Sequence, residues 1–209
     1  MKVNNFEVTL VPGESEQRVP VNHEDGSVAM EHGQTYGVRV QSKWNRRAEM
    51  NLKIDGRDMG TFNIEAFEDD VLYTTPKDPE RGCFTCTLLD TPEGQAMLKD
   101  NTHLGHIQVT LRPEIQRRPP TIDYLESNPG DEMAKGTFSS RSGGGPYAAA
   151  GTAMTGHSNQ QFGSGHKLQL DPAETTIINL RVVGKKPVPQ FRSLESFTHQ
   201  NQVPPRPDR

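Results

Sequence analysis

Apolar and polar residues alternate with a period of two along much of the first half of the chain. Alternate side chains of a β-strand point to opposite faces, so this pattern predicts strands that each bury one face. We expect strands over residues 6–10, 36–40, 47–54, 60–64, 70–75, 82–89 and 106–112, and a weaker one over 18–21. The predicted buried faces carry Phe6, Val8 and Leu10; Tyr36, Val38 and Val40; Met50, Leu52 and Ile54; Ile107, Val109 and Leu111.

Two local signals refine this pattern. The Asp55-Gly56 pair between the apolar runs at 47–54 and 60–64 is typical of a tight hairpin turn, so residues 47–64 are predicted to form a β-hairpin. A short helix is predicted over 92–100. Thr91 would cap it, Pro92 suits the first helical position, and Lys99 lies in the last turn.

About seven short strands joined by turns, with almost no helix, predict an all-β fold. We interpret residues 1–114 as an antiparallel β-sandwich or jelly roll. Leu, Ile, Val and Phe make up only about a fifth of the chain. A half-exposed sheet is compatible with so few apolar residues, because each strand then needs only one apolar face.

The remainder of the chain changes in character. Residues 115–174 are poor in apolar residues and rich in glycine, which predicts one very long excursion from the sandwich. Residues 175–183 alternate again and are predicted to return as a strand to the core. Residues 184–209 form a proline-rich tail that favours extended conformation. Phe191, Leu194 and Phe197 could anchor this tail on a neighbouring subunit; the alternative is a frayed terminus.

Composition and charge exclude several classes of protein. A net charge of −4, with no basic stripe, argues against direct binding of nucleic acid. No apolar run reaches the roughly 18 residues of a membrane helix, so no membrane insertion is expected. The first eight residues lack the apolar core of a signal peptide. We therefore expect synthesis in a cytoplasm, with use there or export inside something larger.

The candidate for metal chemistry is a set of two cysteines and two histidines: Cys83, Cys86, His103 and His106. Two thiolates and two imidazoles are a ligand set for tetrahedral zinc. The spacing differs from that of zinc fingers, however, and cysteines three apart on a strand face opposite sides. The alternative interpretation, small apolar residues of the core, is favoured, and no cofactor is predicted.

Motifs of catalysis are missing from the sequence. The glycines at 143–145 lack the Gly-Lys-Ser/Thr of a phosphate-binding loop, and no nucleophile elbow occurs. We therefore predict a protein that is not an enzyme. Binding has more support, because residues 157–162 group polar side chains around Phe162. This loop could bind a sugar, or it could lie across a neighbouring subunit, which we favour because stacking aromatics are scarce.

The organisation of the whole chain, a compact β-sandwich with a glycine-rich excursion and a proline-rich tail, resembles small structural proteins of virus particles. These are the decoration, cement, vertex and minor capsid proteins. The resemblance implies a subunit located in the virion that repeats as a homo-oligomer or lattice, with loop and tail ordering against other structural subunits. The alternative hypothesis is a carbohydrate- or surface-binding β-sandwich module that uses the loop at 156–166.

Overall fold

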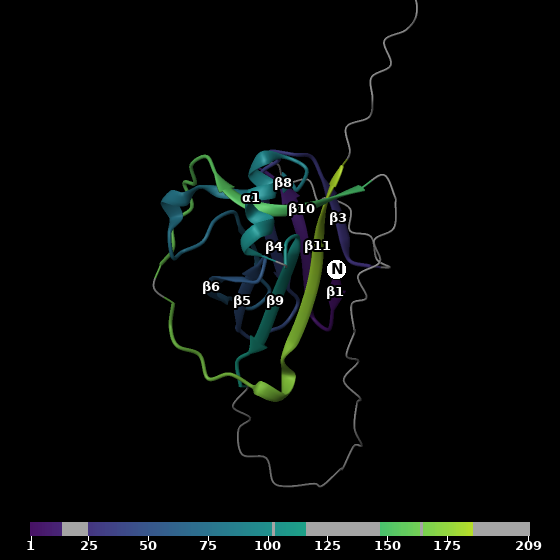
Figure 1. Cartoon of the computed structure of the whole chain (residues 1–209). Coiled ribbons are helices and arrows are strands. Elements are labelled where there is room, and N and C mark those ends of the chain that lie inside the picture. Colours follow the sequence, from purple (N-terminus) through teal and green to yellow (C-terminus); the bar gives the residue numbers. More distant parts are fainter. Residues whose placement is uncertain (14–24, 102, 116–146, 164, 186–209) are drawn as a thin grey trace, which may run out of the picture.

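Two β-sheets pack face to face in the computed structural model, which describes residues 1–13, 25–101, 103–115, 147–163 and 165–185 (Figure 1). The smaller sheet has the order β1 (Lys2–Val3), β2 (Phe6–Pro12), β4 (Tyr36–Ser42) and β7 (Asp69–Leu72). The larger sheet has the order β6 (Arg57–Ile64), β5 (Ala48–Ile54), β9 (His106–Pro113), β11 (Thr176–Lys185), β10 (Tyr147–Thr155) and β8 (Cys83–Leu88). A further strand, β3 (Ser27–Met30), pairs with β11 in parallel. The helical elements are α1 (Pro92–Asp100) and the 3-10 turns η1 (Pro79–Arg81) and η2 (Pro172–Glu174).

The predicted all-β fold class is confirmed, and so is the assignment of core residues. Every predicted inward residue of the runs starting at Phe6, Tyr36, Met50 and Ile107 is at most 1% exposed. The returning strand predicted at 175–183 is β11, whose inward side chains are equally buried. Burial of this set between two sheets supplies the main driving force for folding, at about 25 cal/mol per Å² of apolar surface.

The predicted hairpin at 47–64 is formed by β5 and β6. Asp55 and Gly56 both have positive φ angles, 52° and 73°, which are the angles that a two-residue hairpin turn requires. The register shifts between Leu52 and Lys53, opposite Gly60. The predicted helix is confirmed too: the Thr91 side chain accepts a hydrogen bond from the Gly94 N–H, and Pro92 is the first helical residue.

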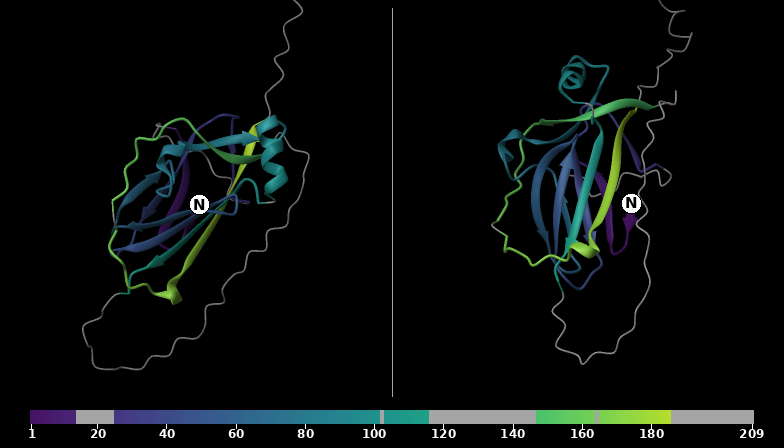
Figure 2. Two further views of the ribbon diagram at one scale, coloured as in Figure 1. Left: turned by 60° about the vertical axis from the view of Figure 1, so that its left-hand side comes forward. Right: turned by 60° about the horizontal axis from the view of Figure 1, so that its bottom comes forward.

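The larger sheet forks beside Gly105, and the fork curls it into a half-barrel. Strand β9 pairs with residues 176–181 of β11. Strand β10 pairs with residues 183–185 of β11 through its first three residues and with β8 through the rest. β8 in turn bonds to residues 33–35, which lead into the smaller sheet. The two further views show β10 crossing over the start of β9 (Figure 2). The fork therefore joins the two layers at one end of the sandwich.

Strand β10 lies within the interval 115–174, where the sequence analysis predicted only an excursion. Its residues, Tyr147-Ala-Ala-Ala-Gly-Thr-Ala-Met-Thr155, carry no alternating pattern and have weak strand propensity. Small residues are needed here because the strands cross closely. A Cβ on Gly151 would lie 3.1 Å from Leu104 Cδ2, and one on Gly184 would lie 1.8 Å from Leu88 Cδ2. The sequence analysis also missed β1 and β3. Residues 184 and 185, predicted to begin the proline-rich tail, instead end β11, while the strand at 18–21 and residues 186–209 of the tail fall outside the described residues.

Candidate functional site

After β10 the chain runs down one side of the sandwich, past the edge strands β7 and β6, to η2 at the opposite end (Figures 1 and 2). We call this segment the strap; it consists of residues 156–163 and 165–170. It contains most of the loop at 156–166 that the sequence analysis put forward for binding. The strap has no strand or helix of its own, yet it is held to both sheets by side chains.

Gln160 fastens the strap to the smaller sheet. Its Oε1 accepts from the Tyr73 N–H at 2.9 Å, and its Nε2 donates to the Val71 carbonyl oxygen at 2.7 Å. An amide side chain thus makes the pair of bonds that another strand would make along the outer edge of β7. An unpaired strand edge is a template for association with other chains, so Gln160 also shields this edge.

Asn63 and Phe162 fasten the strap to the larger sheet. The Asn63 Nδ2 donates to the His166 carbonyl oxygen at 2.7 Å. The Phe162 ring packs on Phe62 of β6 with ring centroids 5.8 Å apart, a normal separation for an aromatic pair. Further along, Glu114 and Leu170 form a β-bridge beyond the end of β9.

Between the strap and the edges of β6 and β7 lies a groove of about 610 Å³. Its walls combine the Phe62–Phe162 pair with the polar side chains of Glu49, Asp70 and Gln161. Burial, together with the charges of Glu68 and Asp69, raises the pKa of Asp70 above its ordinary value. The groove therefore combines two carboxylates with an apolar aromatic pair, and Lys167 also lines it.

A second hollow of about 560 Å³ lies on the other side of Gln160. It is lined by the start of β8, the end of β10 and the first part of the strap, including Cys83, His157 and Asn159. Because Gln160 lines both hollows, they follow each other along the strap.

A buried carboxylate, which the sequence analysis did not single out, holds the fork together. Asp55 is 4% exposed, and its two oxygens accept from the N–H groups of Gly105 and Thr152, each at 2.6 Å. Burial raises the pKa of Asp55 to about 6, against the lowering effect of those two hydrogen bonds. The Asn101 amide donates to the carbonyl oxygen of the same residue. The only local signal was the turn propensity of Asp-Gly, which says nothing of burial.

The structure separates the predicted zinc ligands. Cys83 and Cys86 face opposite sides of β8, and Cys86 is fully buried, so burial raises the pKa of its thiol to about 11. Cys83 lies against the strap, with its Sγ 3.5 Å from the His157 carbonyl oxygen. His103 and His106 instead line a separate pocket on the outer face of the larger sheet. Within the described part of the chain, no three His, Cys, Asp or Glu residues are placed to share a metal ion.

Of the predicted partner-contact residues, Phe162 is half-buried and packs against the core of the sandwich. Phe191, Leu194 and Phe197 lie outside the described residues. The structure instead exposes other large apolar side chains. Phe67 is 68% exposed at a positive φ of 59°, a strained conformation for a residue with a Cβ.

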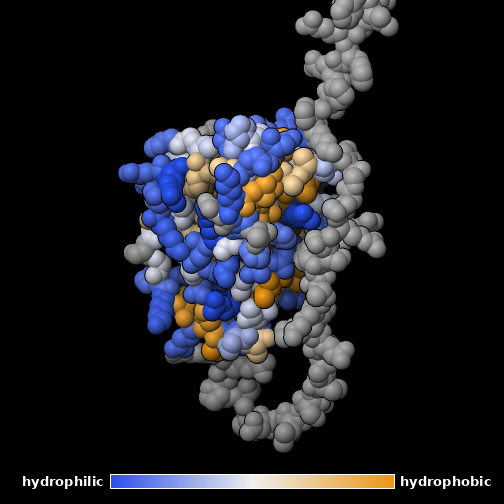
Figure 3. Space-filling view, viewed as in Figure 1, coloured by the Kyte–Doolittle hydropathy of each residue, from blue (hydrophilic) through white to orange (hydrophobic). Residues whose placement is uncertain are grey.

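These exposed apolar residues lie at both ends of the sandwich. Ile115, 46% exposed, shares a surface hollow with Ala66, the residue before Phe67. Tyr147, 53% exposed, pairs with Lys185 at the far end of β11. Ten residues of strand separate the two ends, which is roughly 30 Å. The face seen in Figure 3 is mainly hydrophilic, with orange hydrophobic patches near the top and in the lower half of the view.

Comparison with protein-family models, curated proteins and solved structures finds no match. None of the described helices has the length and apolar character needed to cross a membrane.

Proposed function

We propose that this chain is a non-enzymatic structural subunit of a large assembly, of the kind associated with virus capsids and located in the virion. The observation that carries the proposal is the placement of exposed Phe67 and Ile115 at one end of the sandwich and exposed Tyr147 at the other. Different exposed apolar surfaces at the two ends of one molecule favour head-to-tail contacts between copies. Such contacts generate rings or extended lattices rather than closed dimers. Strain at Phe67 supports a role in contact, because strained residues cluster at functional positions.

The use of polar side chains within the fold also supports this proposal. Strands, turns and strap are held together by hydrogen bonds of polar side chains, among them Asp55, Asn63 and Gln160. Two arginines at one end, Arg46 and Arg47, pair with the carboxylates of Glu174 and Glu114. These groups serve stability and shape, which is what a lattice subunit needs.

The test is sedimentation of material from the native source, with peptide mass spectrometry locating this chain across the gradient. A structural subunit is expected in a fast band, in fixed stoichiometry with other structural proteins. Recovery of the chain only near 23 kDa in the soluble fraction would overturn the proposal.

A second candidate function is binding of a carbohydrate, favoured by the two hollows that follow the strap. Aromatic side chains next to amide and carboxylate groups are the usual lining of sugar sites. Binding on a glycan array that is lost in Asp70→Asn and Gln161→Ala, but kept in the distant control Lys43→Ala, would favour this function. A lattice subunit binds no glycan in this assay.

A further inference from the structure

A pocket of about 300 Å³ on the outer face of the larger sheet is lined by basic and amide side chains. It lies where β5, β9 and β11 run side by side and next to the loop that precedes β9. Its lining residues are Lys53, Gly56, His103, His106, Gln108 and Asn179. No carboxylate or thiol is among these described residues. From the sequence, His103 and His106 were candidate zinc ligands. The side chains around them determine which ligand they can bind.

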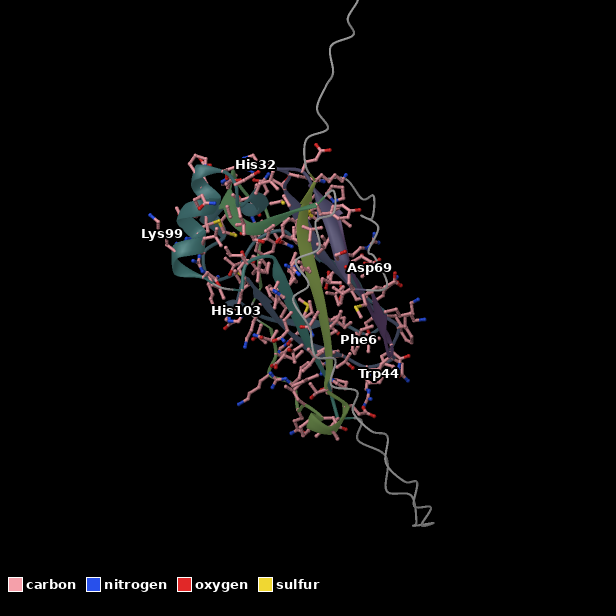
Figure 4. The ribbon with its side chains drawn as sticks, turned by 45° about the vertical axis from the view of Figure 1, so that its right-hand side comes forward. Phe6, His32, Trp44, Asp69, Lys99 and His103 are labelled. Atoms are coloured by element: carbon pink, nitrogen blue, oxygen red, sulfur yellow. The ribbon has the colours of Figure 1, made fainter. Side chains whose placement is uncertain are left out.

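The strand register brings these side chains together. Lys53 faces Gln108, and Gln108 faces Asn179, which makes one row across three strands. The next outward-facing row, about 7 Å along the strands, pairs His106 with Arg181. His103 completes the pocket from the loop, with its ring against Gly56 of the hairpin turn. In Figure 4, His103 lies near the Lys99 end of α1, away from Phe6 and Trp44.

The amide side chains of the pocket are joined by a hydrogen bond and still offer N–H donors to a ligand. Gln108 Nε2 donates to Asn179 Oδ1 at 3.2 Å. Asn179 then offers its amide nitrogen as a donor, and Gln108 keeps a second N–H donor beside its Oε1 acceptor. The Lys53 ammonium adds further donors and a full positive charge on an exposed side chain.

Carboxylates near the pocket are engaged elsewhere. Asp58, opposite Lys53 in register, pairs with Lys77 Nζ at 2.8 Å. Asp55 is directed inward, where both of its oxygens accept backbone N–H bonds. The charge of Arg181 helps to lower the pKa of Asp25, but Asp25 belongs to a turn in which its Oδ1 accepts a hydrogen bond from the Ser27 N–H. The charges that act on the pKa of His106 are those of Arg181 and His103, and Lys53 lines the same pocket.

We propose that this pocket binds a sulfate or phosphate group, either as the free anion or as an ester on a larger molecule. Such a group needs several donors and positive charge in a small space, and bidentate or multiple charge-assisted bonds are the strong ones. A divalent metal ion would meet two histidines but also the Lys53 ammonium, with Arg181 beside His106 and no carboxylate or thiol among the described lining residues. The pocket therefore favours an anion where the same histidines first indicated a cation.

The sign of the pH dependence separates the two possibilities. Burial, the Arg181 charge and His103 lower the pKa of His106 in the empty pocket. A bound anion would instead raise the pKa of His106. Binding of the anion is therefore coupled to protonation of His106 and strengthens as the pH falls. A metal ion needs neutral imidazole, so its binding weakens over the same range.

The experiment is a titration of the full chain with inorganic phosphate, inorganic sulfate and glucose 6-sulfate, followed by NMR shifts of the His103 and His106 ring signals. Sodium chloride at matched ionic strength serves as the blank. For sulfate and glucose 6-sulfate, whose charge does not change over this range, we expect saturable shifts with an affinity about tenfold higher near pH 5.5 than near pH 7.5. If the ester binds about as well as or better than the free anions, the natural ligand is carried by a larger molecule. If only the free anions bind, the pocket is a site for the anion itself.

Matched variants complete the test. Lys53→Ala should weaken binding about tenfold while leaving the thermal unfolding midpoint unchanged, because this side chain is exposed. Lys43→Ala, which removes one exposed positive charge next to the smaller sheet, should bind like the wild type. The proposal is overturned if chloride gives the same shifts, if Lys53→Ala binds normally, or if Zn²⁺ binds tightly near pH 7.5 and is released at the lower pH.

Discussion

Asp55 shows how one residue can be necessary to a fold and still weaken it at neutral pH. Its carboxylate ties the hairpin turn to Gly105 and Thr152, so it holds three separate parts of the chain. The same burial raises its pKa from an ordinary value of 3.8 to about 6. Protonation therefore favours the folded state. The stabilisation that this provides is complete below about pH 3.8 and is lost as the pH rises through about 6.

The Asp55→Asn variant tests this account. At about pH 7.5 it should be destabilised by about 1 to 3 kcal/mol, because the amide nitrogen would face a backbone N–H. At about pH 4.5 the wild type should gain a further ~2 kcal/mol over the variant, because only the carboxylate takes up a proton. Urea unfolding of both proteins at the two pH values measures the difference. A difference independent of pH would contradict the assigned environment of Asp55.

Gly105, at the fork of the larger sheet, is fixed by its surroundings as well as by its backbone angle. Its φ is +80°, and a Cβ there would lie 2.7 Å from the carbonyl oxygens of both Ala150 and Val182. We expect Gly105→Ala to lower the free energy of unfolding by about 3 to 5 kcal/mol.

Gly33→Ala is the matched control, because Gly33 has a similar φ of +75° but open space around it. It should cost about 1 kcal/mol, the backbone strain alone. Denaturant unfolding of the two variants separates strain from steric conflict. Equal losses would mean that β10 does not cross β11 as closely as described.

At the scale of elements, the strap replaces strand pairing with side-chain bonds. Gln160→Ala removes both bonds to the outer edge of β7, and we expect a loss of stability of about 1 to 2 kcal/mol. Hydrogen exchange at the Tyr73 amide should become faster, because that N–H loses its acceptor. The neighbouring Gln161→Ala serves as control, since this exposed side chain should change neither quantity.

Elements with strict alternation could be predicted from the sequence, and elements made of small residues could not. Phe6, Met50 and Ile107 each mark a strand whose neighbours repeat the pattern, and the turn at Asp55-Gly56 fixes a hairpin. Strand β10 has no such pattern, because its small residues are required by close packing against segments distant in sequence, such as α1 beside Gly151. Gln160 was noted as a polar loop residue, but its role depends on an edge strand almost 90 residues earlier.

At the scale of the whole molecule, the exposed apolar residues at the two ends predict how two variants should assemble when they are mixed. Phe67→Glu should block one end and Tyr147→Glu the other, so each variant alone should fail to form long assemblies. If contacts run head to tail, a mixture of the two variants should form dimers of one copy of each and nothing larger. Sedimentation velocity with one variant labelled measures this.

The opposite outcomes are equally clear. Assemblies of wild-type length from either variant would show that its mutated end makes no contact. Absence of mixed dimers would show that like ends meet, or that a different chain is the partner. Both substituted side chains are exposed, so a change in folding is not expected to confuse the result.

Strand β11 lies between β9 and β10 on one side and β3 on the other, yet it is the last described strand of the chain. Proteins are synthesised from the N-terminus, so β3 and β9 are made long before the strand that joins them. The larger sheet therefore cannot close before residues 176–185 have been synthesised. Until then, the edges of β3 and β9 that pair with β11 lack their shared partner.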